Sequence, residues 1–173
     1  MTEPLETGVQ VEPAASATLL IVEIWGDVAV VEARLRATLP APGKALAAAG
    51  WRALWWEPET WLIRPAAEAD STVAAGLSAA IGGEGALTDV SGAFRRIVLQ
   101  GPAWRSLLMI GGVFDAESPS FGPGCVAGTV IHHTPVRLDV LSPTTVEAYV
   151  PPSYAEDLLH HWRRSAARLA AAY

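Results

Sequence analysis

The sequence predicts an α+β fold built from two packed halves, each a split β-α-β unit. Both halves run in the order strand, helix, strand, strand, helix when apolar periodicity and turn residues are followed along the chain. A proline turn leads into a strand, and a second proline ends that strand, at two corresponding places, residues 58–65 and 143–151. The 173 residues are 51% hydrophobic, which supplies enough apolar surface for a packed core.

The first half contains four expected strands and two expected helices. A β-branched run and a tryptophan-rich strand pair around a turn at 57–60 favour strands, and Asp27 and Asp70 are suited to cap the two helices. Gly82 and Gly83 then stop the second helix. The expected strands are 18–25, 51–56, 61–64 and 86–89, and the expected helices are 27–39 and 70–81.

The second half repeats this order. Pro102 favours the first turn of a short helix, and Ser153 with Glu156 has the spacing of a capping box at the start of a long one. Residues 111–125 are rich in Gly, Pro and Ser and predict a surface loop. The expected strands are 95–100, 126–132, 136–141 and 146–150, and the expected helices are 102–108 and 153–169.

We expect a flexible arm over residues 1–16, because this segment is polar, aperiodic and interrupted by prolines. The remainder, residues 17–173, is expected to form a single compact α+β domain. Its two halves are about 17–92 and 93–173.

Charge and targeting signals exclude several classes of function. The formal net charge of −6 and the scattered basic residues disfavour nucleic-acid binding. The N-terminus is acidic where a signal peptide is basic, and the longest apolar run is too short to span a bilayer. We therefore expect a cytoplasmic protein without nucleic-acid or membrane partners.

The histidines occur as two adjacent pairs. His132 and His133 precede Thr134-Pro135, which favours a hairpin turn with exposed imidazoles over a metal site. His160 is expected on the solvent side of the last helix and His161 at the edge of its apolar stripe, so that these rings diverge. No metal site is therefore expected.

Other candidate reactive groups have ordinary structural roles available. Cys125 is the single cysteine, and a free cysteine more often packs as a small apolar residue than acts as a nucleophile. Asp89 is expected to satisfy turn amides, with ligand binding as the less favoured reading. The sequence contains none of the common nucleotide-binding, hydrolase or zinc motifs. We therefore expect no catalytic and no cofactor-binding residues.

Seven tryptophans are the most informative feature of the composition. Trp55 and Trp56 are neighbours on one expected strand and must face opposite sides of its sheet, with Trp61 across the hairpin. One face can therefore display an aromatic surface for a subunit contact, in which we also include Trp104. A core that covers both faces explains the pattern equally well.

Several stretches resemble the gamma subunit of heterotetrameric sarcosine oxidase. They occur in the order of that family over roughly residues 40–165. The stretches are LWWEPETWL at 54–62, ALTDVS at 86–91, LQGPAWRSLL at 99–108, FGPG at 121–124 and VPPSYA at 150–155.

This resemblance implies a fold akin to the folate-binding aminomethyltransferases, whose halves are ferredoxin-like. It also implies a non-catalytic role in a complex that oxidatively demethylates sarcosine. The partners would be the alpha, beta and delta subunits, and FAD, FMN, NAD and tetrahydrofolate would be bound by those partners rather than by this chain.

Two other functions stay open at this stage. The chain could be a stand-alone folate-binding one-carbon protein of the aminomethyltransferase family, although Gly124-Cys125 lacks the Gln-Glu that follows in some relatives. It could also be a self-associating domain without an oxidase partner.

Overall fold

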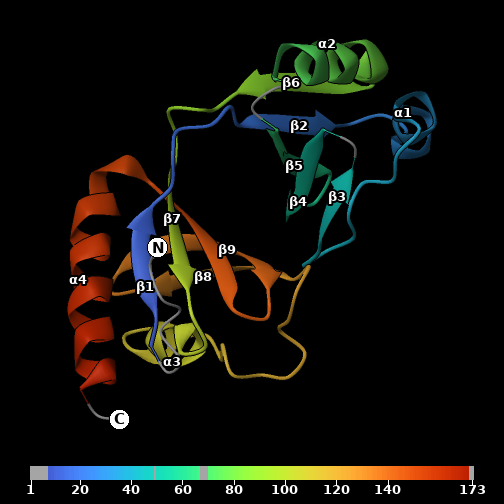
Figure 1. Cartoon of the computed structure of the whole chain (residues 1–173). Coiled ribbons are helices and arrows are strands. Elements are labelled where there is room, and N and C mark those ends of the chain that lie inside the picture. The colour runs from blue at the N-terminus through green and yellow to red at the C-terminus, as the bar shows by residue number, and fades with distance from the viewer. Residues whose placement is uncertain (1–7, 49, 67–69, 172–173) are drawn as a thin grey trace. The chain divides into compact units, whose positions relative to one another are not determined.

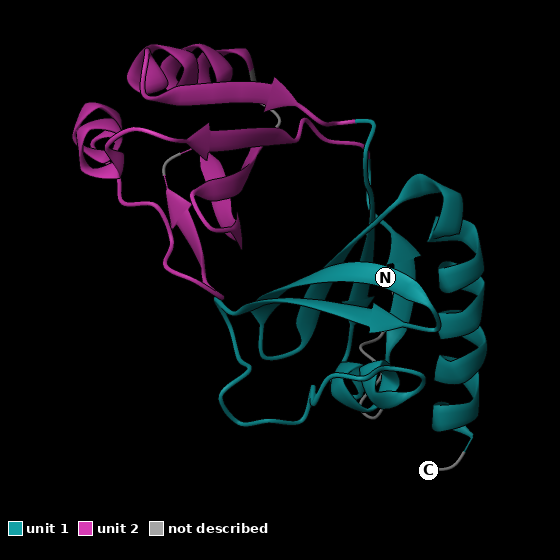
Figure 2. Ribbon diagram, turned by 180° about the vertical axis from the view of Figure 1, so that it is seen from behind, with its two compact units in different colours: residues 1–15, 92–173 teal, residues 16–91 magenta. Residues whose placement is uncertain are grey.

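The computed structural model describes residues 8–48, 50–66 and 70–171, with the side chain of Asp70 excepted. The chain divides into two compact units, shown in different colours in Figure 2. Unit 2 is Ser16–Ser91, and unit 1 combines Met1–Ala15 with Gly92–Tyr173. The segment Met1–Ala15 is grouped with Gly92–Tyr173 and not with unit 2, which follows it in the sequence.

Unit 2 has one antiparallel sheet and two helices. The sheet order is β3-β4-β5-β2-β6, so that β5 lies between β2, which precedes α1, and β4, which follows α1 and the edge strand β3. This is the split β-α-β arrangement expected from the sequence. The elements are β2 (Leu20–Ile24), α1 (Val28–Leu35), β3 (Ala45–Ala48), β4 (Trp51–Glu57), β5 (Thr60–Pro65), α2 (Asp70–Ile81) and β6 (Gly85–Asp89).

The helix ends of unit 2 follow their sequence signals in part. Asp27 is the N-cap of α1, and its carboxylate accepts a hydrogen bond of 2.8 Å from the backbone N–H of Ala29. The helix stops at Leu35 and not at Leu39, because Arg36 adopts a left-handed conformation with φ of 53°. The expected cap by Asp70 lies outside the described side chains.

The core of unit 2 joins one face of the sheet to both helices. Val31 of α1 and Leu77 of α2 are buried at 0% and 1% exposure among side chains of β2, β4 and β5. Strand β3 was not expected, because its sequence ALAA has no β-branched residue, and it pairs only with β4 at the sheet edge.

Unit 1 repeats the arrangement with one strand taken from the opposite end of the chain. Its antiparallel sheet has the order β1-β7-β10-β9-β8, with β10 between β7 and β9. The elements are β1 (Gln10–Pro13), β7 (Arg95–Gln100), α3 (Trp104–Met109), β8 (Val126–Ile131), β9 (Thr134–Ser142), β10 (Thr145–Val150) and α4 (Pro152–Ala170).

The expectation of a flexible arm is wrong for Gln10–Pro13. These residues form β1, which pairs along β7, and Val11 is only 3% exposed. Helix α4 runs beside β1 (Figure 1), and Arg163 donates a 2.9 Å hydrogen bond to the backbone carbonyl of Val11. A short polar strand gains its stability from this tertiary pairing, which local sequence does not reveal.

Helix α4 was predicted correctly in extent but not in its cap. Its apolar stripe packs on the sheet, with Leu158 and Trp162 at 1% and 0% exposure. The N-cap position is Pro151, no side chain caps the helix, and Pro152 is its first residue. Ser153 therefore lies inside the first turn with Glu156 just beyond that turn, and the expected capping box does not form.

Candidate functional site

Two of the four tryptophans expected at a subunit contact are part of the chain's own core. Trp61 is 6% exposed and donates its indole N–H to the carbonyl of Pro40 at 2.9 Å. Trp104 is 0% exposed and donates to the carbonyl of Pro143, also at 2.9 Å. Their surfaces are thus covered within the chain, so the interface interpretation is wrong for both.

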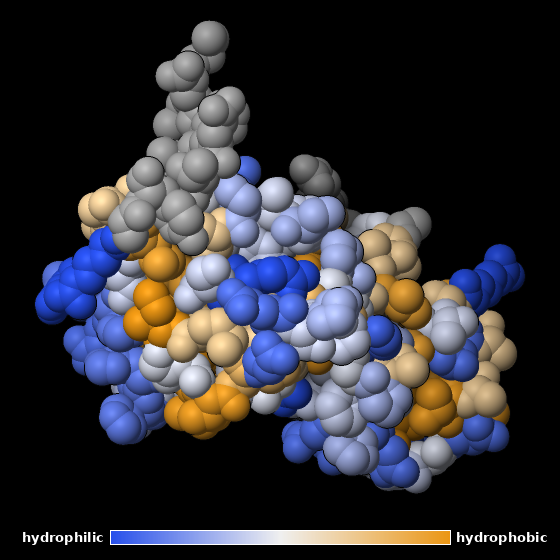
Figure 3. Space-filling view, turned by 90° about the horizontal axis from the view of Figure 1, so that it is seen from below, coloured by the Kyte–Doolittle hydropathy of each residue, from blue (hydrophilic) through white to orange (hydrophobic). Residues whose placement is uncertain are grey.

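The other two, Trp55 and Trp56, are half-buried neighbours on β4. Trp55 packs beside the core of unit 2. Trp25, which follows β2, is 63% exposed and was not singled out by sequence reasoning. On the face shown in Figure 3, hydrophobic residues form small patches among hydrophilic ones.

The candidate reactive groups have the ordinary partners expected for them. Cys125 is 7% exposed, and its thiol donates to the carbonyl of Ser120 at 3.3 Å. The carboxylate of Asp89 accepts hydrogen bonds from the hydroxyl and the backbone N–H of Ser91, at 2.6 and 2.8 Å. These two bonds, the hydroxyl's first, lower the pKa of Asp89.

The two histidine pairs, by contrast, meet in space. All four imidazoles line one hollow of about 590 Å³, which we call the histidine hollow. The rings of His132 and His161 stack with centroids 4.2 Å apart and planes 11° from parallel. The rings of His132 and His133 also lie only 5.8 Å apart, so the divergence expected for this pair is wrong. One member of each pair meets the other pair. The stacking of His132 on His161 cannot be predicted from either pair alone.

The β8–β9 turn brings His132 and His133 to the hollow. Ile131 pairs with Thr134, which leaves only these two histidines in the turn. Their φ angles are 48° and 67°, so both are left-handed, as a type I′ turn requires. Asn-Gly is the usual choice for such a turn, because other residues crowd their Cβ in this conformation.

Helix α4 supplies the opposite wall of the histidine hollow. Arg164 and Arg168 lie one turn apart beyond His160 and His161, and Tyr154, Asp157 and Ser165 complete the helical lining, with Ile110 and Thr134 at its other side. Arg164 and Arg168 are exposed at the surface of the chain.

The chemistry of His161 reflects this setting. Burial lowers its pKa, the neighbouring His132 lowers it further, and Arg164 and Arg168 add to the effect. A hydrogen bond with the backbone of Ile110 acts in the opposite direction. The Nε2 atom of His161 is buried and has no hydrogen-bond partner.

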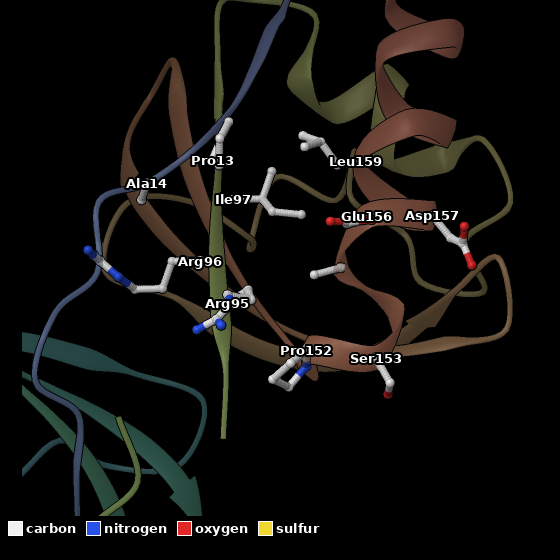
Figure 4. A pocket seen from close by; sticks show the side chains of 11 residues that line it. Pro13, Ala14, Arg95, Arg96, Ile97, Pro152, Ser153, Glu156, Asp157 and Leu159 are labelled. Atoms are coloured by element: carbon white, nitrogen blue, oxygen red, sulfur yellow. The ribbon is translucent and has the colours of Figure 1, made fainter. Parts of the chain in front are cut away.

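A second hollow, of about 560 Å³, lies at the start of α4 beside β1 and β7. Figure 4 shows Arg95 and Arg96 on one side and Glu156 and Asp157 on the other, above an apolar floor that includes Ile97. Charges of both signs line it, and Arg96 is already engaged with Glu147 at 2.6 Å.

Within the described residues, no group of three His, Cys, Asp or Glu side chains is placed to hold a metal ion. None of the described helices is both long and apolar enough to cross a membrane.

Comparison with known families decides the relationship. The family model described as sarcosine oxidase, gamma subunit family, matches residues 26–168. The chain belongs to this family. No curated protein sequence matches the chain.

Two solved structures share the fold of this chain. A chain of heterotetrameric sarcosine oxidase from Corynebacterium sp. U-96, in complex with pyrrole 2-carboxylate, is 23% identical with a TM-score of 0.84, covering 95% of this chain and 86% of that one. Aminomethyltransferase T of the glycine cleavage system from Bartonella henselae is 16% identical with a TM-score of 0.63. The match covers 91% of this chain but only 46% of the aminomethyltransferase. The expected likeness to the aminomethyltransferase fold is thus confirmed.

Proposed function

We propose that this gamma-subunit family member is a non-catalytic assembly subunit of a heterotetrameric oxidase that demethylates sarcosine. The observation that carries the proposal is the family match over residues 26–168. The partners would be alpha, beta and delta subunits, and these would bind the FAD, FMN, NAD and tetrahydrofolate of the complex. We place the assembled enzyme in the cytoplasm.

The setting of the candidate nucleophile supports a structural role. The Cys125 thiol is 7% exposed and donates to a backbone carbonyl, whereas a reactive thiolate requires exposure and an electropositive setting. Asp89 is engaged by Ser91, as is usual for a carboxylate that stabilises a turn.

For the contact with partner subunits, Trp25 is 63% exposed, and Trp55 and Trp56 are half-buried and keep part of their surface exposed. Large aromatic side chains are the commonest anchors of protein interfaces, because they bury much area with few rotatable bonds. We therefore propose that unit 2, which carries all three, contacts another subunit.

The stand-alone folate-binding alternative is not favoured. The family model that matches belongs to an oxidase subunit, and the aminomethyltransferase similarity is a similarity of fold over less than half of that protein.

Co-expression with candidate alpha, beta and delta subunits tests the assembly role. We expect a tagged full-length chain to retain partners that bring flavin absorbance and sarcosine-dependent hydrogen peroxide production, and to show neither on its own. Saturable binding of flavin or tetrahydrofolate by the chain alone, or its failure to retain any partner, would contradict the proposal.

Substitutions within the assembled enzyme test the absence of a catalytic group. We expect Cys125→Ala and Asp89→Asn to leave kcat and KM for sarcosine within twofold of the parent. A loss of kcat of a hundredfold or more, in an intact assembly with full flavin content, would identify the substituted residue as catalytic.

A further inference from the structure

We propose that the histidine hollow of unit 1 is a binding site for an oxyanion, either a carboxylate or a tetrahedral anion. The anion would lie between the guanidinium groups of Arg164 and Arg168 on α4 and the imidazoles of the β8–β9 turn. The assembly role does not require this site, and the site would exist in the free chain.

The two arginines provide the first support. They are four residues apart on one face of α4, where like charges repel each other unless an anion lies between them. Guanidinium groups donate paired hydrogen bonds whose geometry fits carboxylate and phosphate oxygens. Asp157 is the only carboxylate among the described lining residues, and it lies about two turns earlier on the helix.

The β8–β9 turn provides a second, independent support. Two adjacent non-glycine residues in the left-handed region are unusual, and glycine or asparagine at these positions would be less strained. The turn brings both imidazoles to the hollow that Arg164 and Arg168 also line. Residues held in an unfavourable backbone conformation are found preferentially at binding sites.

The imidazoles can adapt their charge to an anion. The titratable and charged groups that line the hollow with His161 are His132 and His133 from the turn, and Tyr154, Asp157, His160, Arg164 and Arg168 from α4. Without a ligand, burial and, to a smaller extent, the neighbouring His132, Arg164 and Arg168 lower the pKa of His161. A bound anion would favour the imidazolium form, so that anion binding and proton uptake become coupled.

The histidine hollow has a volume of about 590 Å³, which lies in the range of small-ligand sites. The same hydrogen-bond donors would bind a free small anion or a carboxylate presented by another subunit. Both sources share one chemistry, and the experiment below separates them.

Sulfate is a suitable probe, because it keeps two negative charges throughout the pH range in which histidine titrates. We expect sulfate, added to the full-length chain at constant ionic strength, to shift the NMR amide signals of residues 110–112, 131–134 and 160–168 saturably. Binding should be at least threefold tighter at pH 6 than at pH 8. Succinate would test a dicarboxylate in the same way.

Variants separate this site from general charge attraction. Arg164→Gln with Arg168→Gln should weaken sulfate binding about tenfold or more, because two charge-assisted interactions are lost. His132→Asn keeps a residue that tolerates the left-handed turn, and it should reduce the pH dependence. Arg36→Gln makes a single equivalent charge change on exposed surface in unit 2 and should leave binding unchanged.

The assembled oxidase distinguishes the two sources. Sulfate binding that persists after assembly would identify a free small anion as the ligand. Loss of sulfate binding on assembly, with weaker assembly of the double arginine variant, would identify a partner's carboxylate. Absence of saturable shifts at pH 6, or equal binding by the parent and the folded double arginine variant, would overturn the proposal.

Discussion

Two ion pairs in unit 1 have the same chemistry but very different surroundings. Arg96 and Glu147 meet at 2.6 Å with side chains only 10% and 3% exposed, and Tyr149 donates a 3.0 Å hydrogen bond to the second carboxylate oxygen. Arg163 and Glu12 meet at 2.7 Å with 48% and 68% of their side chains exposed. Burial removes the water that would otherwise solvate either partner left alone.

This contrast gives a stability prediction. Glu147→Ala leaves the Arg96 guanidinium buried without its carboxylate, and we expect the free energy of unfolding to fall by about 3–5 kcal/mol. Glu12→Ala breaks an exposed pair and should cost about 0–1 kcal/mol. Urea unfolding of both variants measures the difference, and equal losses would contradict the assignment of the effect to burial.

His161 makes stability depend on pH. Because its folded-state pKa lies below the ordinary 6.5, the unfolded chain binds the proton more readily, so stability falls as pH drops below about 6.5 towards the lowered pKa. We expect His161→Gln to reduce this loss between pH 7 and pH 5, as measured by urea unfolding at each pH. His160→Gln, at the exposed neighbouring position, is the control and should retain more of the pH dependence.

The β8–β9 turn shows how one element can favour a site over stability. With φ of 67°, His133 occupies a conformation that glycine adopts without Cβ strain. We expect His133→Gly to raise the free energy of unfolding by roughly 0.5–1 kcal/mol, because left-handed strain is worth about 1–2 kcal/mol and the glycine's greater chain entropy offsets part of it. Thermal unfolding checks this, and destabilisation would show that the imidazole is needed for packing.

Elements with strong local signals could be predicted, and elements made by tertiary pairing could not. The apolar stripe of α4 and the alternating strands of both sheets gave their positions to within a few residues. Strand β1 has no such signal and exists because β7 offers it an edge. The cap of α4 was misread because Pro152 already fixes the first turn, which leaves Ser153 inside it.

The histidine hollow could not be predicted for a similar reason. Spacing rules consider each pair alone and predict that its two imidazoles diverge, whereas the rings of His132 and His133 lie 5.8 Å apart. They say nothing about residues on two different elements, and the stacked pair of His132 and His161 is created only by packing of the β8–β9 turn beside α4. The available signal was the chemistry that both histidine pairs share with Arg164 and Arg168, since all of these side chains can bind an anion.

Over the whole chain, the two units share one arrangement of strands and helices, but their edge strands β6 and β1 come from different places in the sequence. In unit 2 the strand beside β2 is β6, which follows α2, whereas in unit 1 the equivalent strand beside β7 is β1, which comes from the N-terminus. Unit 2 is thus one continuous segment inserted between β1 and the rest of unit 1. Such an insertion leaves each unit its own core and its own surface for contacts.

Trp25 of unit 2 provides the test of how those surfaces are used. Its side chain is 63% exposed, although burial of an aromatic ring of this size is favourable by several kcal/mol only when a partner covers it. We expect Trp25→Ala to weaken retention of partner subunits tenfold or more while the melting temperature of the free chain stays nearly constant. Val113→Ala, at a position 84% exposed in unit 1, is the control and should retain partners fully. Equal retention by both variants would place the subunit contact away from Trp25 and leave Trp55 and Trp56 of β4 as the aromatic groups to substitute next.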